Sequence, residues 1–321
     1  MSVDNKNVNN DPTQEKIKFI LELFNSNKLI ETKKEIEKLL IKYSKSSILF
    51  NILGAVLAGQ NKPQEALENY NKSIKINPNY TQAYNNLGVC LHSLNKIDEA
   101  IQSYQKAIVI QPKHADAYNN LGVVLKDQGH LEEAFRVCQQ AIKNNPGYAT
   151  AYNNLGVILH KKGEFEGAIL AYRRAIEISP DNSEAYNNLG ASLHAQGDLG
   201  KSVQAYNQAI TTNPQFAEGH KNLGMLLLQK GDFEKGWELC EWRWLCKDFP
   251  FEHRNFPQPS WDGSSLNGRS ILVWAEQGVG DEIMFASILA DLLQMKANIM
   301  VECDSRLVPL FQRSFPKIQF F

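Results

Sequence analysis

The sequence predicts a mainly α-helical protein, an α-solenoid of antiparallel helix pairs followed by an incomplete α/β segment. Three observations lead to this prediction. The string AYNNLG occurs at steps of 34 residues, beginning at Ala83, Ala117, Ala151 and Ala185. A Trp- and Pro-rich stretch interrupts this period after residue 236. Beyond residue 269, short apolar runs alternate with helical patterns, which is typical of the start of a parallel βα domain.

Each 34-residue unit repeats the same set of structural signals. A Leu-Gly pair recurs in the first helix, and glycine there costs about 1 kcal/mol relative to alanine. Its recurrence predicts that another helix packs too close for a side chain. Seven residues later comes a residue that tolerates the left-handed conformation at a helix end: Asn61, Asn95, Gly129, Gly163, Gly197 and Gly231. A small residue, then a bulkier one, and a final proline mark the second helix.

These positions resemble those of the tetratricopeptide repeat. The resemblance implies helix pairs that stack into a curved solenoid, residues 13–250, with a concave surface. The register defines the windows 13–46, 47–80, 81–114, 115–148, 149–182, 183–216 and 217–250. The first window is expected to cap the solenoid, and the polar residues 1–12 are expected to be disordered.

Composition excludes several classes of function. The chain has 34 Lys+Arg and 35 Asp+Glu, and this near-neutral balance does not indicate a nucleic-acid-binding protein. Its five cysteines form no CxxC pair, which argues against a zinc site or a disulfide framework. No segment resembles a signal peptide or a membrane span. We therefore expect a cytoplasmic protein without a metal, a cofactor, a nucleic-acid partner or a membrane span.

Two adjacent asparagines recur in the first helix of each unit, on the face that lines the groove in the repeat family. The first asparagine column is Asn85, Asn119, Asn153 and Asn187. The second asparagine column is Asn86, Asn120, Asn154, Asn188 and Asn222. Asparagine is a poor helix former, and its carboxamide both donates and accepts hydrogen bonds. The second column resembles the asparagine ladder of O-linked N-acetylglucosamine transferases, which implies binding to the backbone of a protein or peptide partner.

Two alternatives for these asparagines stay open at this point. The carboxamides can bond to the neighbouring repeat, or they can persist from recent duplication of the units. Further along the same face lie Lys126, His160 and His194. Neighbouring helices are about 8–10 Å apart, too far for one metal ion to be held by successive rungs, so we expect these side chains to be solvated groove residues.

The segment after the repeats follows a different pattern. Residues 251–268 form a Trp/Pro-rich linker, whose aromatics are expected to pack against the next domain rather than to stack on sugars or bases. The segment 269–321 predicts strands at 271–275, 298–302 and 318–321, with helices at 282–295 and 305–313. A Gly-x-Gly loop follows the first strand, a place that suits an anion. The third glycine of a dinucleotide-binding fingerprint is absent.

From Pro259 to Phe285 the sequence resembles the first βα unit of bacterial repeat proteins that carry a glycosyltransferase-like domain related to heptosyltransferases. The resemblance implies that Asp281 is a general base and that a nucleotide-sugar is the donor. The candidate anion or substrate loop that follows the first strand comprises Glu276, Gln277, Gly278 and Gly280. Only 52 residues follow Arg269, whereas a domain half needs about 150.

The sequence therefore predicts first a protein-binding scaffold, and as the alternative a truncated glycosyltransferase that is inactive as this chain. Nucleotide binding by the C-terminal segment alone ranks last.

Overall fold

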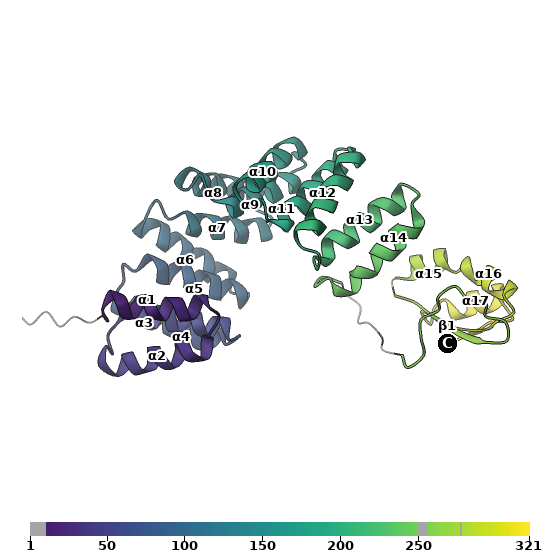
Figure 1. Ribbon diagram of the computed structural model, residues 1–321, viewed down its shortest axis with the longest axis horizontal. Helices are drawn as coiled ribbons and strands as arrows, with labels where there is room; N and C mark the ends of the chain where they lie inside the picture. The colour runs from purple at the N-terminus through teal and green to yellow at the C-terminus, as the bar shows by residue number, and fades with distance from the viewer. Residues whose placement is uncertain (1–10, 250–253, 255, 277) are drawn as a thin grey trace, which may run out of the picture. The chain divides into compact units, whose positions relative to one another are not determined.

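The computed structural model describes residues 11–249, 254, 256–276 and 278–321. The chain forms two compact units, Met1–Arg243 and Trp244–Phe321, here called unit 1 and unit 2 (Figure 1). Within the described residues, unit 1 is helical, and the strands all lie in unit 2. The described helices include none that is long and apolar enough to cross a bilayer.

Unit 1 is built from helix pairs, each consisting of a first helix (the A helix) and a second helix (the B helix). The A helices are α1 (Gln14–Asn25), α3 (Ser47–Gly59), α5 (Thr81–Ser93), α7 (Ala115–Asp127), α9 (Ala149–Lys161), α11 (Ser183–Ala195) and α13 (Ala217–Gln229). The B helices are α2 (Leu29–Lys42), α4 (Pro63–Ile76), α6 (Ile97–Ile110), α8 (Leu131–Asn144), α10 (Phe165–Ile178), α12 (Leu199–Thr212) and α14 (Phe233–Cys240). Each window predicted from the sequence holds one such pair.

The recurring glycine of the A helix packs against the bulky residue of its own B helix. A Cβ atom on Gly156 would lie 2.5 Å from the ring of Tyr172, which is almost fully buried. The same contact recurs between Gly88 and Tyr104. Protein interiors are close-packed, so a side chain at these positions would overlap the ring. The prediction that a helix packs too close for a side chain is confirmed.

The turn inside each pair contains a residue in the left-handed conformation. The φ angle is +59° at Asn95 and +80° at Gly129. The same conformation occurs in every pair, at Asn27, Asn61, Asn95, Gly129, Gly163, Gly197 and Gly231. Since Asn and Gly adopt this conformation at low cost, the predicted turns are confirmed. Asn27 extends the register to the first pair.

The A helices lie on the inner side of unit 1. Successive A helices from α3 to α13 contact one another directly, whereas successive B helices among the described residues make marginal contact at most. Elements on the inner side of a curved stack are closer together than those on the outer side. Figure 1 shows α7, α9 and α11 on the inner side of the arch of unit 1 and α8, α10 and α12 on its outer side.

The last pair departs from the others. Helix α14 has 8 residues where the preceding B helix has 14, and the 3-10 helix Glu241–Leu245 follows it. Unit 1 ends at Arg243, whereas the sequence places the end of the last repeat at residue 250, outside the described residues. Aromatic packing explains the earlier boundary: the Trp244 ring lies 5.0 Å from that of Phe249 and 6.0 Å from that of Trp274.

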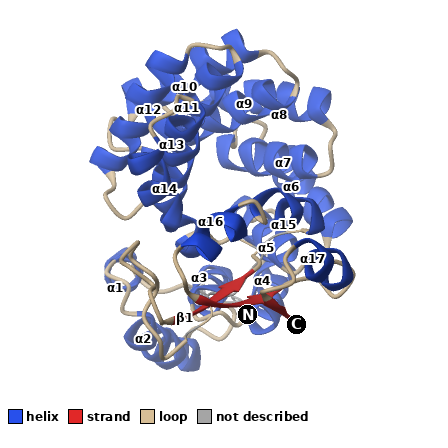
Figure 2. Cartoon of the chain, turned by 90° about the vertical axis from the view of Figure 1, so that its right-hand side faces the viewer, coloured by secondary structure: helices blue, strands red, loops and turns tan. Residues whose placement is uncertain are grey.

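The described residues of unit 2 form a small parallel sheet with three α-helices. Strands β1 (Ser270–Trp274), β2 (Asn298–Glu302) and β3 (Gln319–Phe320) pair in this order, with Ser270 opposite Asn298 and Met300 opposite Gln319. In Figure 2 the strands form a single red sheet. Helices α15 (Val279–Phe285) and α16 (Ile288–Gln294) connect β1 to β2, and α17 (Val308–Ser314) connects β2 to β3. Their core consists of Leu266, Leu289, Leu292, Ile299, Val301, Leu307, Phe311, Ile318 and Phe320.

Two helix predictions in this unit are wrong in detail. The single helix predicted over 282–295 is divided into α15 and α16. At the break, the Ser287 hydroxyl donates to the Met284 carbonyl at 3.1 Å, a local bond that competes with the helix. The helix predicted over 305–313 begins only at Val308, because the Asp304 carboxylate accepts a hydrogen bond from the Arg306 amide and forms a turn first.

Some predicted segments are described only in part. Residues 1–10 of the predicted disordered N-terminus lie outside the described residues, while Asp11 accepts a hydrogen bond from Ser46 at 2.5 Å. In the predicted linker, residues 251–253 and 255 also lie outside them. Arg254 is described, and its guanidinium lies 5.1 Å from the ring centroid of Trp274 and bonds to Glu302.

Candidate functional site

The first asparagine column is part of the core between repeats. These side chains are buried, with 3% of Asn119 and 4% of Asn153 exposed to solvent. The column also includes Asn51, which lies 34 residues before Asn85 and is equally buried. Sequence analysis missed Asn51 because the doubled asparagine is replaced there by Asn-Ile. The alignment of Leu53-Gly54 with Leu87-Gly88 is the signal that could have found it.

A continuous set of side-chain hydrogen bonds links the two columns across neighbouring repeats. In each bond the Nδ2 of a second-column asparagine donates to the Oδ1 of the first-column asparagine one repeat earlier. The distance is 3.1 Å from Asn120 to Asn85 and 2.9 Å from Asn154 to Asn119. The remaining bonds join Asn86 to Asn51, Asn188 to Asn153 and Asn222 to Asn187. The interpretation that the asparagines bond to the neighbouring repeat is therefore correct for these atoms.

The hydrogen bonds that link the two columns are here called the asparagine ladder, and each second-column asparagine with its bond is called a rung. The ladder does not use all the polar atoms of the second column. Each Nδ2 carries two hydrogens and donates one of them to the neighbouring repeat. The Oδ1 of Asn86 accepts from Gln82, and that of Asn120 lies 3.4 Å from Asn119 Nδ2.

The Oδ1 atoms of the last three rungs, Asn154, Asn188 and Asn222, accept no hydrogen bond from the described residues. They are not among the buried atoms without a partner, so they reach solvent. Each of these asparagines therefore has one acceptor that meets solvent and one amide hydrogen without a partner among the described residues.

An apolar column lies beside the second asparagine column, three residues further along each A helix. Val89 is 48% exposed and Met225 is 59% exposed. The column comprises Val89, Val123, Val157, Ala191 and Met225. None of these five side chains carries a charge, so every rung presents one carboxamide and one small or flexible apolar group.

The predicted groove residues of the next turn all have polar partners, within the same helix for Lys126 and in the following repeat for His160 and His194. The Lys126 ammonium pairs with Asp127 at 3.1 Å. The Nδ1 atom of His160 lies 2.8 Å from the Ser192 hydroxyl. Burial lowers the pKa of His160 from its ordinary value, so this ring is neutral at neutral pH. The Nε2 atom of His194 lies 2.7 Å from Gln229 Oε1 in the following repeat. Among the described residues, no group of three His, Cys, Asp or Glu could hold a metal.

The predicted anion loop of unit 2 follows β1. Asp281 is the third residue of α15, and Gly278 occupies the N-cap position of this helix. Both Gly278 and Gly280 have open space where a Cβ atom would lie, and neither has a positive φ. Glu276 is half-buried and Gln277 lies outside the described residues.

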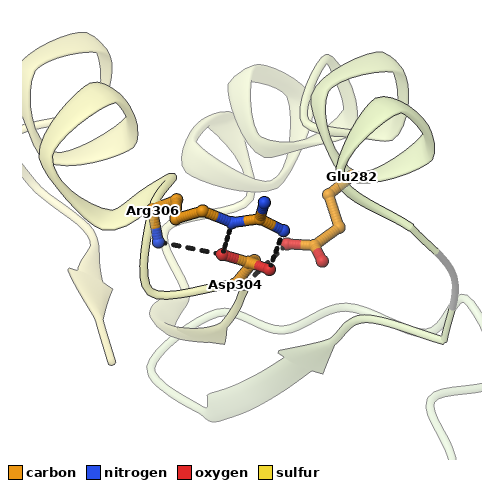
Figure 3. Close-up of polar contacts among 3 residues, drawn as sticks. All are labelled: Glu282, Asp304 and Arg306. Carbon is orange, nitrogen blue, oxygen red and sulfur yellow. Dashed lines mark hydrogen bonds and ion pairs between the residues drawn. The ribbon is translucent and has the colours of Figure 1, made fainter.

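Three charged residues join α15, which follows β1, to the loop after β2 (Figure 3). Glu282 accepts a hydrogen bond from the Asp304 amide at 2.8 Å. The Asp304 carboxylate makes a bidentate pair with the Arg306 guanidinium at 2.9 and 2.7 Å. This hydrogen-bonded pair lowers the pKa of Asp304 to about 2. Sequence analysis missed this cluster because it depends on where the chain turns after β2.

Comparisons with known families identify the repeats. A family model described as "TPR repeat" matches residues 90–129, 124–163, 158–197 and 192–231. Two models described as "Tetratricopeptide repeat" match residues 69–102 and 49–80. The matched residues run without a gap from 49 to 231. These matches end at residue 231, so the glycosyltransferase resemblance of residues 256–321 rests on sequence motifs alone.

One curated relative is Protein FlbA from Caulobacter vibrioides, which is 34% identical over 88 residues. The match covers 26% of this chain and 15% of that protein's length.

Solved structures share the fold. The crystal structure of the APC/C hetero-tetramer Cut9-Hcn1 has a TM-score of 0.63 at 18% identity, over 73% of this chain and 46% of that one. A structure of Pseudomonas aeruginosa pilF has a TM-score of 0.57 at 18% identity, over 64% and 94%. At such identities the likeness shows the fold alone. The 34-residue register, the glycine and tyrosine packing and the family matches together show that this chain belongs to the tetratricopeptide repeat family.

Proposed function

We propose that unit 1 is a scaffold that binds an extended segment of a partner protein on its inner face. The observation that carries the proposal is the difference between the two asparagine columns. The first column is buried and its Oδ1 atoms accept bonds from the next repeat, whereas the Oδ1 atoms of Asn154, Asn188 and Asn222 meet solvent. A column of unused donors and acceptors can pair with the N–H and C=O groups of an extended chain.

The exposed apolar column supports the same function. Val89 and Met225, at the two ends of this column, are about half exposed, and the three members between them are half-buried, so covering the column removes apolar area from water. Together the two columns give backbone pairing and shallow side-chain contact, and this combination favours many related segments over one unique sequence.

The experiment must leave the ladder intact. Replacing Asn120 or Asn154 would leave a buried Oδ1 atom of the preceding repeat without its donor, and so would confound binding with stability. We instead suggest Val157→Glu with Met225→Glu on the inner face, beside Asn154 and Asn222. The matched control is Val109→Glu with Leu170→Glu, which changes two exposed apolar residues of B helices.

A random library of linear peptides is selected against the full chain, and the enriched peptides are titrated by fluorescence anisotropy. The inner-face variant should weaken their binding at least about tenfold, or 1.4 kcal/mol, while the control variant should bind as the wild type does. Unfolding curves show that both variants are folded. Equal binding by the wild type and the inner-face variant, or failure to enrich any peptide, would reject the proposal.

Sugar transfer is a second candidate, assigned to unit 2. One observation favours it: the loop that carries Glu276 and Gly278 lies at the carboxyl end of a parallel strand, where open α/β sheets bind ligands. The full chain would be incubated with radiolabelled nucleotide-sugars and a protein acceptor, beside Asp281→Asn. Incorporation that the substitution abolishes supports transfer, and equal incorporation or none counts against it.

A further inference from the structure

The spacing of the rungs restricts the conformation of the bound segment, an argument that rests on the proposed function. Consecutive A helices are in direct contact, and their carboxamides are joined by hydrogen bonds of 2.9–3.1 Å. Packed helices lie about 8–10 Å apart. A ligand that makes the same contact at every rung must therefore repeat its own structure about every 8–10 Å.

Among regular extended conformations, polyproline II meets this requirement. It has three residues per turn and a rise of about 3.1 Å per residue, so one face recurs about every 9.3 Å. A β-strand presents the same face about every 6.7 Å, and it would present opposite faces to consecutive rungs three residues apart. Polyproline II also makes no internal hydrogen bonds, so its N–H and C=O groups are free to pair with carboxamides.

The rungs with unused atoms define the length and the chemistry of the segment. Asn154, Asn188 and Asn222 are consecutive, on α9, α11 and α13. Three rungs match about nine residues at three residues per turn. Beside them lie the uncharged side chains Val157, Ala191 and Met225. A charged residue facing these positions would lose water without gaining a partner.

We infer that the inner face of α9, α11 and α13 binds an uncharged segment of about nine residues in the polyproline II conformation. The segment carries an apolar residue with a free backbone N–H at every third position. Each such residue places its N–H and C=O against one second-column asparagine and its side chain against the apolar column. Proline suits the other two positions, because their N–H groups meet no rung.

Two peptides of identical composition test the three-residue period. The first probe is fluorescein-labelled PPVPPVPPVPPV, and the second is PVPVPVPVPPPP. Both have four valines and eight prolines and favour the same backbone conformation, so they differ only in valine spacing. A third probe carries N-methylvaline at each valine of the first and so lacks the N–H donors. All are titrated into the full chain by fluorescence anisotropy.

The first probe should bind at least fivefold more tightly than the second, and N-methylation should remove most of this binding. Ala191→Glu should weaken the first probe at least about fivefold, or 1 kcal/mol. Gln204→Glu adds the same charge to an exposed position of α12 and should leave binding unchanged. Unfolding curves establish that Ala191→Glu is folded.

The outcomes separate this inference from the proposed function. If both spacings bind equally and Ala191→Glu weakens both, the inner face binds peptides without a three-residue period, and the inference alone is overturned. If Ala191→Glu alters neither, the inner face is not the binding site, and both proposals fail. Absence of binding of the first probe up to about 1 mM, a free energy near −4 kcal/mol, also overturns the inference.

Discussion

In unit 1 the same contact recurs from repeat to repeat, whereas in unit 2 each contact is made once. The pairing of an A-helix glycine with a B-helix tyrosine occurs at Gly54, Gly88, Gly156 and Gly190. Unit 2 also has glycines after its first strand, but nothing lies within 4 Å of a Cβ atom at Gly278 or Gly280. The recurring glycine of the A helix thus indicates close packing, whereas Gly278 and Gly280 in unit 2 do not.

The largest effect on stability is expected from a Gly→Ala substitution, which can be made in both units and compared. Gly156→Ala places a methyl group 2.5 Å from the buried Tyr172 ring. Overpacking of a core costs about 1–3 kcal/mol, which outweighs the gain of about 1 kcal/mol from replacing a helical glycine. We expect the free energy of unfolding of unit 1 to fall by up to about 2 kcal/mol, measured by urea denaturation followed by circular dichroism.

Gly280→Ala is the matched control in unit 2. It lies within α15 and has open space around it, so only the helix-propensity gain applies. Unit 2 should keep its stability or gain up to about 1 kcal/mol. If the two substitutions had the same sign, the packing explanation of the recurring glycine would be contradicted.

The next effect concerns the asparagine ladder. Asn154→Ala removes the donor to Asn119 Oδ1, which is buried. A buried acceptor without its partner costs about 1–3 kcal/mol, so we expect a loss of about 1–2 kcal/mol in unit 1. A double-mutant cycle with Asn119→Ala should give a coupling energy of about 1 kcal/mol.

Asn207→Ala provides the comparison within the same unit. Asn207 is exposed on α12 and bonds only to its own helix, so its loss should change stability by less than about 0.5 kcal/mol. A coupling energy near zero between Asn119 and Asn154 would show that the ladder adds nothing to repeat stacking.

Repetition also determines how much could be predicted from the sequence. In unit 1 the 34-residue register predicts the helix pairs, the turns at Asn95 and Gly129 and the glycine packing. Each assignment is supported by the equivalent positions of the other repeats, so an ambiguous position in one repeat does not mislead the prediction. The roles of the two asparagine columns could not be predicted. Neighbouring residues on a helix differ by 100° in direction, and only the packed stack decides that Asn119 is buried while Asn120 is half-exposed.

In unit 2 the strands near residues 270 and 298 follow from apolar runs, but local hydrogen bonds set the helix ends. Ser287 interrupts the helical pattern, and the turn at Asp304 delays α17. The hydrophobic periodicity of the sequence gives no information about such bonds. The cluster of Glu282, Asp304 and Arg306 depends on these turns, so it could not be predicted from the sequence either.

A smaller effect distinguishes the turns of the two units. Every turn of unit 1 uses Asn or Gly at its left-handed position, but Lys296 in unit 2 has φ of +54°. This conformation costs a residue with a Cβ atom about 1–2 kcal/mol. Glycine avoids this cost, but its larger conformational entropy in the unfolded state offsets part of the gain in stability. We expect Lys296→Gly to stabilise unit 2 by about 0.5–1 kcal/mol, measured by hydrogen exchange of the β2 amides.

Gly129→Ala should have the opposite sign in unit 1. Its φ is +80° and nothing lies within 4 Å of a Cβ atom, so the expected loss of about 1 kcal/mol comes from the backbone alone. Faster exchange at β2 in Lys296→Gly would show that the lysine side chain contributes more than its backbone conformation costs.

The smallest effect is the acid response of the Asp304–Arg306 pair. The hydrogen bonds from Arg306 lower the pKa of Asp304 to about 2, below the ordinary value of about 3.9. A carboxyl whose pKa is lower in the folded state stabilises that state above its unfolded pKa. The contribution is lost as the pH falls from about 4 to about 2. The pair is largely exposed on the Arg306 side, so the change in unfolding midpoint should be small.

Carbon NMR titration of the Asp304 carboxyl measures this response directly. In the wild type the resonance should titrate near pH 2, and in Arg306→Gln it should move towards the ordinary range, because the charged donor is lost while Glu282 still accepts from the Asp304 amide. In unit 1, Lys201 lowers the pKa of Asp198 through a similar local bond, and that carboxyl should not respond to Arg306→Gln. A wild-type Asp304 that titrates near 3.9 would mean that the bidentate pair does not persist in solution, and the turn before α17 would then need another cause.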